Sequence, residues 1–222
     1  MRKLFDTPIK ITNRLGELMT SREQLLEVAE AMALARAECT DNDPFGSRGW
    51  RGYQMGSRRL RETHVGVKVT VGEWVKDDQD QVPSILNKKA GARIVVCNTD
   101  AGTALKDKQP QNNSKKGSAN ERAIEANQFS FMEELDKSVT PIRAAEKNPS
   151  IVTYYLCCFA NGEEFRAELS CPVSYENGFF GDFVERIFLT GGDTGTFEPT
   201  KRPKPDEDND GTDYQIPVTR KK

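Results

Sequence analysis

The apolar residues of this chain recur at two different spacings, one near its start and one in its last third. Between Ser21 and Thr40 they return every three or four positions, which predicts an amphipathic helix. Ser21 can cap the start of this helix. In a capping box the Gln24 side chain then accepts a hydrogen bond from the Ser21 main-chain N–H. The predicted buried stripe consists of Leu25, Val28, Met32 and Ala35.

The last third instead alternates apolar and polar residues, as half-buried strands do. Residues 151–159 and 163–169 flank Asn161 and Gly162, and an Asn-Gly pair predicts a hairpin with a two-residue type I′ turn. A third strand at residues 182–189 should extend this sheet. The turn sets three pairs on one face of the hairpin: Tyr154–Leu169, Leu156–Ala167 and Cys158–Phe165.

The middle of the chain carries weaker patterns of both kinds. Residues 64–71 alternate valines with other residues, which predicts a half-buried strand, and residues 92–98 predict a buried one. Between these two, Pro83 and Gly91 predict the start and the end of a short helix.

A polar, turn-rich stretch follows at residues 99–120. A loop of this length inside a domain is usually functional or mobile. Ser118 and Glu121 then form a second capping box, which predicts a helix through about Asn127. A further short helical segment is expected at residues 131–138.

These elements predict the α+β class, with an N-terminal helix and a mixed or antiparallel sheet that ends in a C-terminal β-hairpin meander. We expect one domain over residues 1–190. Residues 191–222 are rich in glycine, proline and charged residues of both signs, which predicts a flexible, disordered tail.

Composition limits how the protein can attract a partner. Thirty-two basic and 34 acidic residues leave a net charge of −2, so binding to a polyanion requires a local patch and not a global field. No apolar run is long enough to span a membrane, and no secretory signal follows the first residues. The five cysteines are odd in number and form no CxxC pair, which favours buried thiols in a reducing, cytoplasmic setting.

The strongest candidate for such a patch is the arginine-rich stretch Ser47–His64. As a helix it places the arginines on one side and Trp50, Tyr53, Leu60 and His64 on the other. Its three glycines instead favour a loop that precedes a helix starting near Ser57. Arg48, Arg51, Arg58, Arg59 and Arg61 then either bind phosphates from an open surface, or are solvated or paired with carboxylates of neighbouring segments.

The polar loop supplies a second set of cations just before a predicted helix start. Lysine, asparagine and serine beside a helix N-terminus suit a phosphate, although the P-loop pattern is absent. A flexible surface loop is the alternative. The lysines concerned are Lys106, Lys108, Lys115 and Lys116.

Candidates for catalysis and metal binding are weaker. Strand carboxylates at Glu164, Glu168, Asp182 and Glu185 resemble a magnesium-dependent nuclease site, but an exposed strand face explains their alternation equally well. The acidic run at residues 206–211 imitates the start of a calcium loop without its final glutamate. We predict no catalytic residue, no cofactor and no metal site.

Three further side chains have two interpretations each. His64 is the only histidine, and no nucleophile signature accompanies it, so a structural role is favoured over a general base. Tyr155 and Phe159 share the second face of the hairpin. They either stack on bases or lie under the Ser21–Thr40 helix or a subunit interface, and the covered position is favoured.

The leading hypothesis is therefore a non-enzymatic nucleic-acid-binding or regulatory protein that contacts phosphates through its arginine patch. The second is an interaction or assembly protein, for instance the subunit of a homo-oligomer, because arginine and tyrosine are also common interface anchors. The third is a metal-dependent nuclease or phosphoesterase that uses the strand carboxylates.

Overall fold

Strands from both halves of the chain form one mixed sheet of seven strands in the computed structural model, which describes residues 3–66, 73–135 and 151–191. The α+β class is confirmed. The helices are α1 (Pro8–Glu17), α2 (Arg22–Ala37), α3 (Ser47–His64) and α4 (Ser118–Leu135), with one 3₁₀ turn at Gln79–Gln81. The strands of the main sheet are β1 (Lys3–Phe5), β2 (Val75–Asp77), β3 (Ser84–Asn87), β4 (Ala92–Asn98), β5 (Val152–Ala160), β6 (Phe165–Pro172) and β9 (Phe183–Phe188).

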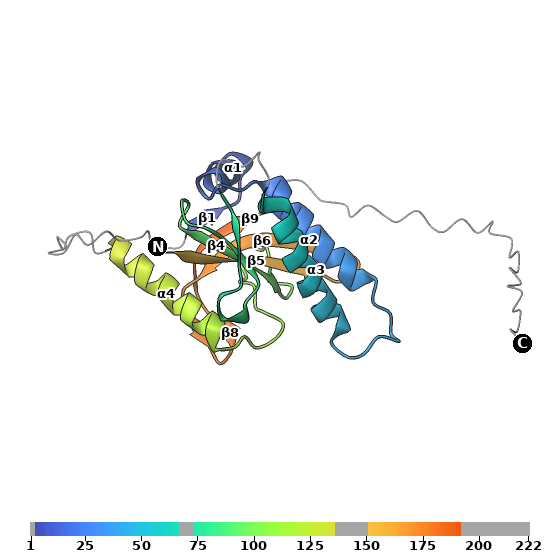
Figure 1. Ribbon diagram of the computed structural model, residues 1–222. Helices are drawn as coiled ribbons and strands as arrows, with labels where there is room; N and C mark the ends of the chain where they lie inside the picture. The colour runs from blue at the N-terminus through green and yellow to red at the C-terminus, as the bar shows by residue number, and fades with distance from the viewer. Residues whose placement is uncertain (1–2, 67–72, 136–150, 192–222) are drawn as a thin grey trace, which may run out of the picture.

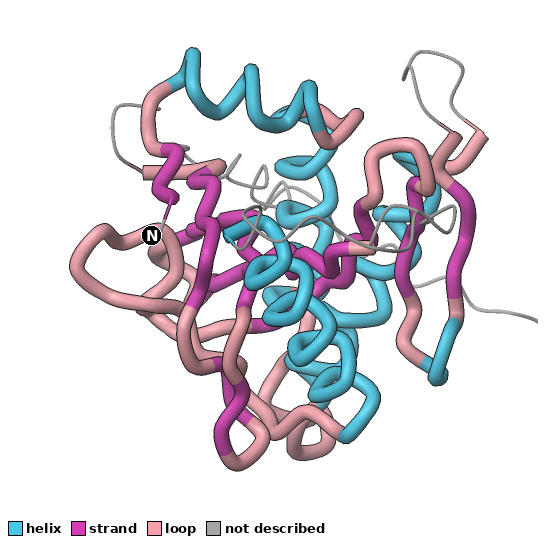
Figure 2. The backbone as a smooth tube through the Cα atoms, turned by 90° about the vertical axis from the view of Figure 1, so that its left-hand side faces the viewer, coloured by secondary structure: helices cyan, strands magenta, loops and turns pink. Residues whose placement is uncertain are grey.

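The order of the strands is β1-β9-β6-β5-β4-β3-β2. Only β1–β9 and β4–β5 pair in parallel, and the other neighbours are antiparallel. A small hairpin of β7 (Tyr175–Glu176) and β8 (Phe179–Phe180) lies outside the main sheet. Long stretches of loop, drawn in pink in Figure 2, join these elements, and the longest within the described residues runs from 99 to 117.

Each face of the sheet has its own apolar core. On one face α2 and α3 lie side by side, with α1 at one end (Figure 1), and they bury a cluster that includes Met32, Leu60 and Leu156. On the other face α4 and the β7–β8 hairpin cover a smaller cluster around Tyr155 and Phe180. The alternation of β5 and β6 supplies side chains to both cores, because successive residues of a strand point to opposite faces.

The helix predicted from the first periodic stretch is α2, and its stripe of Leu25, Val28, Met32 and Ala35 is buried as expected. Ser21 accepts the capping hydrogen bond from the Gln24 main-chain N–H at 3.2 Å. The reciprocal half of the capping box is wrong. The Gln24 side chain donates instead to the carbonyl oxygen of Thr63, and so ties α2 to the end of α3.

All of Ser47–His64 is helical, so the alternative of a loop before Ser57 is wrong. The glycines that favoured a loop instead allow α3 to pack closely against α2. A Cβ on Gly56 would lie 2.8 Å from Met32 Sδ, and one on Gly52 would lie 2.8 Å from Arg36 Cγ. Because both neighbours belong to α2, the glycines let the two helices approach more closely than alanine would allow.

Two predicted elements are different in the structure. Residues 83–91 contain strand β3 and not a helix, since β3 pairs on both sides, with β2 and β4. The Asn87 side chain then accepts from the N–H groups of Lys89 and Ala90, which forms the turn into β4. Of the strand predicted at 64–71, residues 67–71 lie outside the described part, His64 ends α3, and Val65 forms one bridge, to Trp74.

The β5–β6 hairpin forms with the predicted faces but with its register shifted by two residues. Leu156 pairs with Leu169, and Ala160 with Phe165, so four residues form the turn. The Asn161 side chain accepts from the N–H groups of Glu163 and Glu164, which stabilises this wider loop. The Asn-Gly turn occurs instead at Asn177 and Gly178, where both φ angles are positive and β7 meets β8.

The second capping box is wrong as well, because α4 begins at Ser118 itself. The helix continues to Leu135, beyond the predicted end near Asn127, and includes the start of the segment predicted at 131–138. The predicted third strand of the sheet is β9, which lies next to β6. Of the predicted tail, residues 192–222 lie outside the described part, as does the acidic run at 206–211.

Substitution of Gly56 by alanine should destabilise the protein by about 1–3 kcal/mol, because the added methyl group overpacks the contact with Met32, which is fully buried. Gly49→Ala on the same helix is the matched control, since a Cβ there meets nothing within 4 Å. We expect it to be neutral or stabilising by up to about 1 kcal/mol. Urea unfolding measures both, and equal effects of the two substitutions would contradict close packing at Gly56.

His64 should make the protein less stable in mild acid. The ring is buried, with Nε2 2.9 Å from Thr20 Oγ1 and Nδ1 3.0 Å from the Leu60 carbonyl oxygen, and burial lowers the pKa of His64 to about 4. The unfolded chain therefore binds a proton between pH 6.5 and 4 that the folded protein does not bind. The free energy of unfolding should fall by up to about 3 kcal/mol across that window and stay level above it.

Urea unfolding at pH 7 and pH 4.5 tests this expectation. His64→Gln keeps polar atoms at the site but does not titrate, so its loss of stability between the two pH values should be smaller than that of the parent protein. An equal loss in both proteins would exclude His64 as the cause.

Candidate functional site

Each of the five α3 arginines has a carboxylate partner. Arg48 pairs with Asp41, Arg51 with Asp43, Arg58 with Glu62, Arg59 with Glu27 and Glu62, and Arg61 with Asp78. The sequence left open whether these arginines lie on an open surface that binds phosphates or are solvated or paired with carboxylates. In the structure they are paired.

These ion pairs differ in what surrounds them. Arg58 and Arg59 share Glu62, and Glu27 of α2 completes a surface network in which positive and negative charges alternate. Single exposed pairs contribute only about 0–1 kcal/mol and are screened by salt, so they do not lock the arginines in place. They do cancel much of the positive field along this part of α3. The arginine helix is therefore a weak attractant for a polyanion.

The four loop lysines lie in two places. Lys106 forms an ion pair with Asp6, at 2.6 Å, next to β1. Lys108 lies in the same part of the loop, where its carbonyl oxygen accepts from Arg186. Lys115 and Lys116 lie at the other end, just before α4. The loop and α3 meet at this second end, where Lys116 lies over the Tyr53 ring.

A groove opens where Lys116 approaches α3, with a volume of about 820 Å³. It lies at the carboxyl end of β4, between the first half of α3, the end of α2 and residues 113–116. Ten residues line it: Arg36, Phe45, Gly46, Gly49, Trp50, Tyr53, Asn98, Asn113, Ser114 and Lys116. Two are cations, three are aromatic, and none carries a carboxylate.

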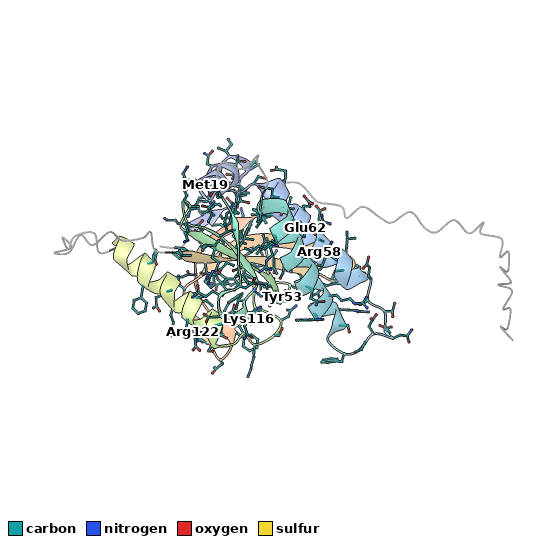
Figure 3. The ribbon with its side chains drawn as sticks, in the orientation of Figure 1. Met19, Tyr53, Arg58, Glu62, Lys116 and Arg122 are labelled. Atoms are coloured by element: carbon teal, nitrogen blue, oxygen red, sulfur yellow. The ribbon has the colours of Figure 1, made fainter. Side chains whose placement is uncertain are left out.

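The aromatic wall of the groove is a pair of stacked rings. Trp50 and Tyr53 have centroids 6.1 Å apart and planes 27° from parallel. The Lys116 ammonium lies over the Tyr53 ring, with Nζ 5.9 Å from the ring centroid (Figure 3). Trp50 was expected in the core with Tyr53, Leu60 and His64. It is 60% exposed instead, because the first half of α3 lines the groove at the end of the sheet.

Lys116 is half-buried yet charged at neutral pH. Burial alone would lower the pKa of Lys116, but the adjacent Cys97 sulfur and, to a smaller extent, the Tyr53 hydroxyl outweigh burial and hold this pKa above its usual value. The Cys97 thiol is itself fully buried, and burial raises its pKa. All five cysteines are buried free thiols, as the sequence indicated.

Arg36 and Asn98 hold the floor of the groove, and the sequence did not single out either residue. Arg36 donates to Asn98 Oδ1 at 3.2 Å and to the carbonyl oxygen of Ala160 at 3.3 Å. Asn98 in turn donates to the Gly49 carbonyl oxygen at 2.8 Å. This network joins α2, α3 and the carboxyl ends of β4 and β5. The one signal in the sequence is that Arg36 follows Met32 by four residues, which places a cation at the end of a buried stripe.

The strand carboxylates do not form a shared site. Glu168 is fully buried and accepts from Arg186 at 2.6 and 2.9 Å, from the Ser170 hydroxyl and from the main-chain N–H of Ala104. Glu185 lies on the opposite face of the sheet, paired with Arg14. Glu164 pairs with Arg166 on the surface. The expectation of an exposed face through Glu168 is wrong, because the 99–117 loop covers that residue.

Tyr155 is covered, as favoured, but by a different helix from the one expected. Its hydroxyl donates to Asn120 of α4 at 3.0 Å, and its ring packs on Phe180. Phe159 is half-buried and lies against the Arg166 guanidinium, 4.9 Å from the ring centroid. Neither ring belongs to the groove. His64 has the structural contacts described above, and it also lies outside the groove.

Within the described ranges, no helix combines the length and apolar character needed to cross a membrane. The same residues contain no group of three or more histidine, cysteine, aspartate or glutamate side chains arranged to hold a metal ion. Comparisons with protein-family models, with curated proteins and with solved structures found no match. The groove is therefore the basis on which function is inferred.

Glu168→Gln should destabilise the protein by about 3–5 kcal/mol, because it leaves the buried Arg186 guanidinium without its counter-charge. Glu164→Gln is the matched control, in the turn just before β6, where the ion pair with Arg166 is exposed, and we expect it to cost less than about 1 kcal/mol. Chemical denaturation measures both. A small effect at Glu168 would mean that the buried pair is not the anchor of this face.

Proposed function

We propose that this protein binds nucleic acid and that the groove lined by Trp50, Tyr53, Arg36 and Lys116 is its point of contact. The observation that carries the proposal is the charge of the lining. Two cations and no carboxylate line the groove, whereas every arginine of α3 faces a carboxylate. In a chain with a net charge of −2, this is a place where an anion meets positive charge without a competing acid.

The chemistry of the groove fits a nucleotide better than a simple anion. Its volume lies within the range of about 300–1,000 Å³ that is typical of ligand sites. The aromatic rings supply flat apolar surface, and proteins that bind single strands combine such rings with cations that follow the phosphates. Lys115, exposed next to Lys116, extends the positive charge beyond the groove.

In this proposal the arginines have a smaller part than the sequence indicated. Arg58 and Arg59 form an ion-pair network with Glu27 and Glu62, and we assign them to the surface of the helix pair. Arg48 and Arg51 pair with Asp41 and Asp43, which precede α3 in the chain. Those exposed pairs are weak enough to exchange a carboxylate for a phosphate.

Assembly with another protein is the second candidate, since Phe45 and Trp50 are both exposed at the mouth of the groove. Aromatic rings of this kind also anchor protein interfaces. The two functions differ in their dependence on salt, because releasing counterions from phosphates makes nucleic-acid binding weaken steeply as salt rises.

Binding of labelled single-stranded and duplex DNA and RNA, titrated at several salt concentrations, tests the proposal. Lys116→Met keeps the aliphatic stem but removes the charge. It should weaken binding about tenfold and reduce the slope of log affinity against log salt by about 0.7, the effect of one phosphate contact on a single strand.

Lys106→Met is the matched control, because it makes the same change at the distant ion pair with Asp6. It should leave affinity and slope unchanged, as should Arg58→Ala with Arg59→Ala. Equal losses in the Lys116 and Lys106 variants would place binding outside the groove. A parent protein that binds no nucleic acid at low salt would refute the proposed function, and a defined oligomer in light scattering would then favour assembly.

A further inference from the structure

One ring of the groove, that of Trp50, is stacked on a neighbour and open to solvent. Trp50 is held by its stack on Tyr53, and Tyr53 in turn packs against the core beneath α3. The Trp50 side chain nevertheless remains 60% exposed, so much of the indole is open to a ligand. Phe45, which is fully exposed, stands at the same groove.

Three N–H donors of residues that line or adjoin the groove have no hydrogen-bond partner within the described residues. The main-chain N–H groups of Arg48 and Gly49, at the start of α3, donate no hydrogen bond within the described residues. Gly46, the residue before the helix, has no side chain to cap them. Nε of Arg36 is buried and also lacks a partner among the described residues. The first N–H groups of a helix have no partner within the helix, so those of Arg48 and Gly49 are free to donate to an acceptor bound in the groove.

We infer that the groove takes an unpaired nucleotide, whose base stacks on Trp50 and whose phosphate is bound by Lys116 and the N-terminus of α3. This inference rests on the proposed function and specifies the ligand of the same site. Indole and base are both flat and apolar on their faces, and stacking accepts any base. The lysine and the free N–H groups supply the contacts that a phosphate requires.

The same geometry excludes a base that stays inside a duplex. Bases in a double helix are stacked on both faces, and bringing one out costs a few kilocalories per mole of unstacking and unpairing. Single strands, frayed ends and free nucleotides offer the required base without that cost. The protein should therefore prefer single strands to duplexes, while a free nucleoside monophosphate should bind the same site more weakly, because it has no neighbouring phosphates.

The fluorescence of Trp50 reports directly on this site. The other tryptophan, Trp74, is 2% exposed and its indole N–H donates to the Met19 carbonyl oxygen, so it is shielded from a ligand. We would titrate the full chain with oligothymidylate, with an abasic strand of equal length, with a duplex and with thymidine monophosphate. The abasic strand keeps the phosphates and lacks the bases, so it separates stacking from charge.

We expect oligothymidylate and thymidine monophosphate to quench tryptophan fluorescence, and the abasic strand to leave it nearly unchanged. Trp50→Ala should weaken binding of oligothymidylate by roughly 5- to 150-fold, the range for the loss of one base–aromatic stack, and leave the abasic strand unaffected. Phe129→Ala is the matched control, since it removes an exposed aromatic ring on α4, outside the groove.

The failures of this inference and of the proposed function are distinguishable. If oligothymidylate binds with the salt and Lys116 dependence described above but without quenching, and Trp50→Ala has no effect, nucleic-acid binding stands and the stacked base is refuted. Equal loss of affinity for the base-bearing and abasic strands in Trp50→Ala would also refute it, as would a duplex that binds as tightly as the single strand. A parent oligomer that dissociates in Trp50→Ala would assign the ring to self-association.

Discussion

The close approach of α2 and α3 determines where every other part of the site lies. Gly52 and Gly56 bring the two helices together so tightly that Met32 and Arg36 lie against glycine and not against a larger side chain. The contact fixes α3 over the sheet, and its first half then extends to the carboxyl end of β4. Arg36 and Asn98 join both helices to the strand ends there. The groove results from this packing, with one wall on a rigid helix pair and the other on the 99–117 loop.

Charge is distributed unevenly over this scaffold. The outer face of α3 carries arginines that carboxylates neutralise, and the ion pairs Arg14–Glu185 and Arg186–Glu168 lie on opposite faces of the sheet. Positive charge without a facing acid lies in the groove, next to aromatic rings. A count of arginines along the sequence therefore overstates the positive charge of α3, because it does not include the acids that pair with them.

The sequence predicted most clearly what depends on local periodicity. The stripe of α2 follows from its spacing of three and four residues, the two faces of β5 and β6 from alternation, and strand β4 from a short continuous apolar run. Elements set by distant partners were missed. β3 is a strand because two neighbours pair with it, and the hairpin register depends on a hydrogen-bonded loop at Asn161. Trp50 was assigned to the core, since a helical projection does not show where the sheet beneath ends. Lys116 was recognised as a candidate from its lysine-rich loop. Arg36 was not, because the periodicity of α2 does not show that its last turn reaches the end of the sheet.

Arg186 holds the 99–117 loop in place through main-chain atoms of the loop. Its guanidinium donates to the carbonyl oxygens of Leu105 and Lys108 while it remains paired with Glu168. Every amino acid provides such an oxygen, so the anchor makes no demand on which side chains occupy those two positions. The loop can accept substitutions there and keep its path, provided that the buried pair is retained. The path of the loop across the sheet is thus determined by Glu168 of β6 and Arg186 of β9, which lie more than 50 residues after the loop in the sequence.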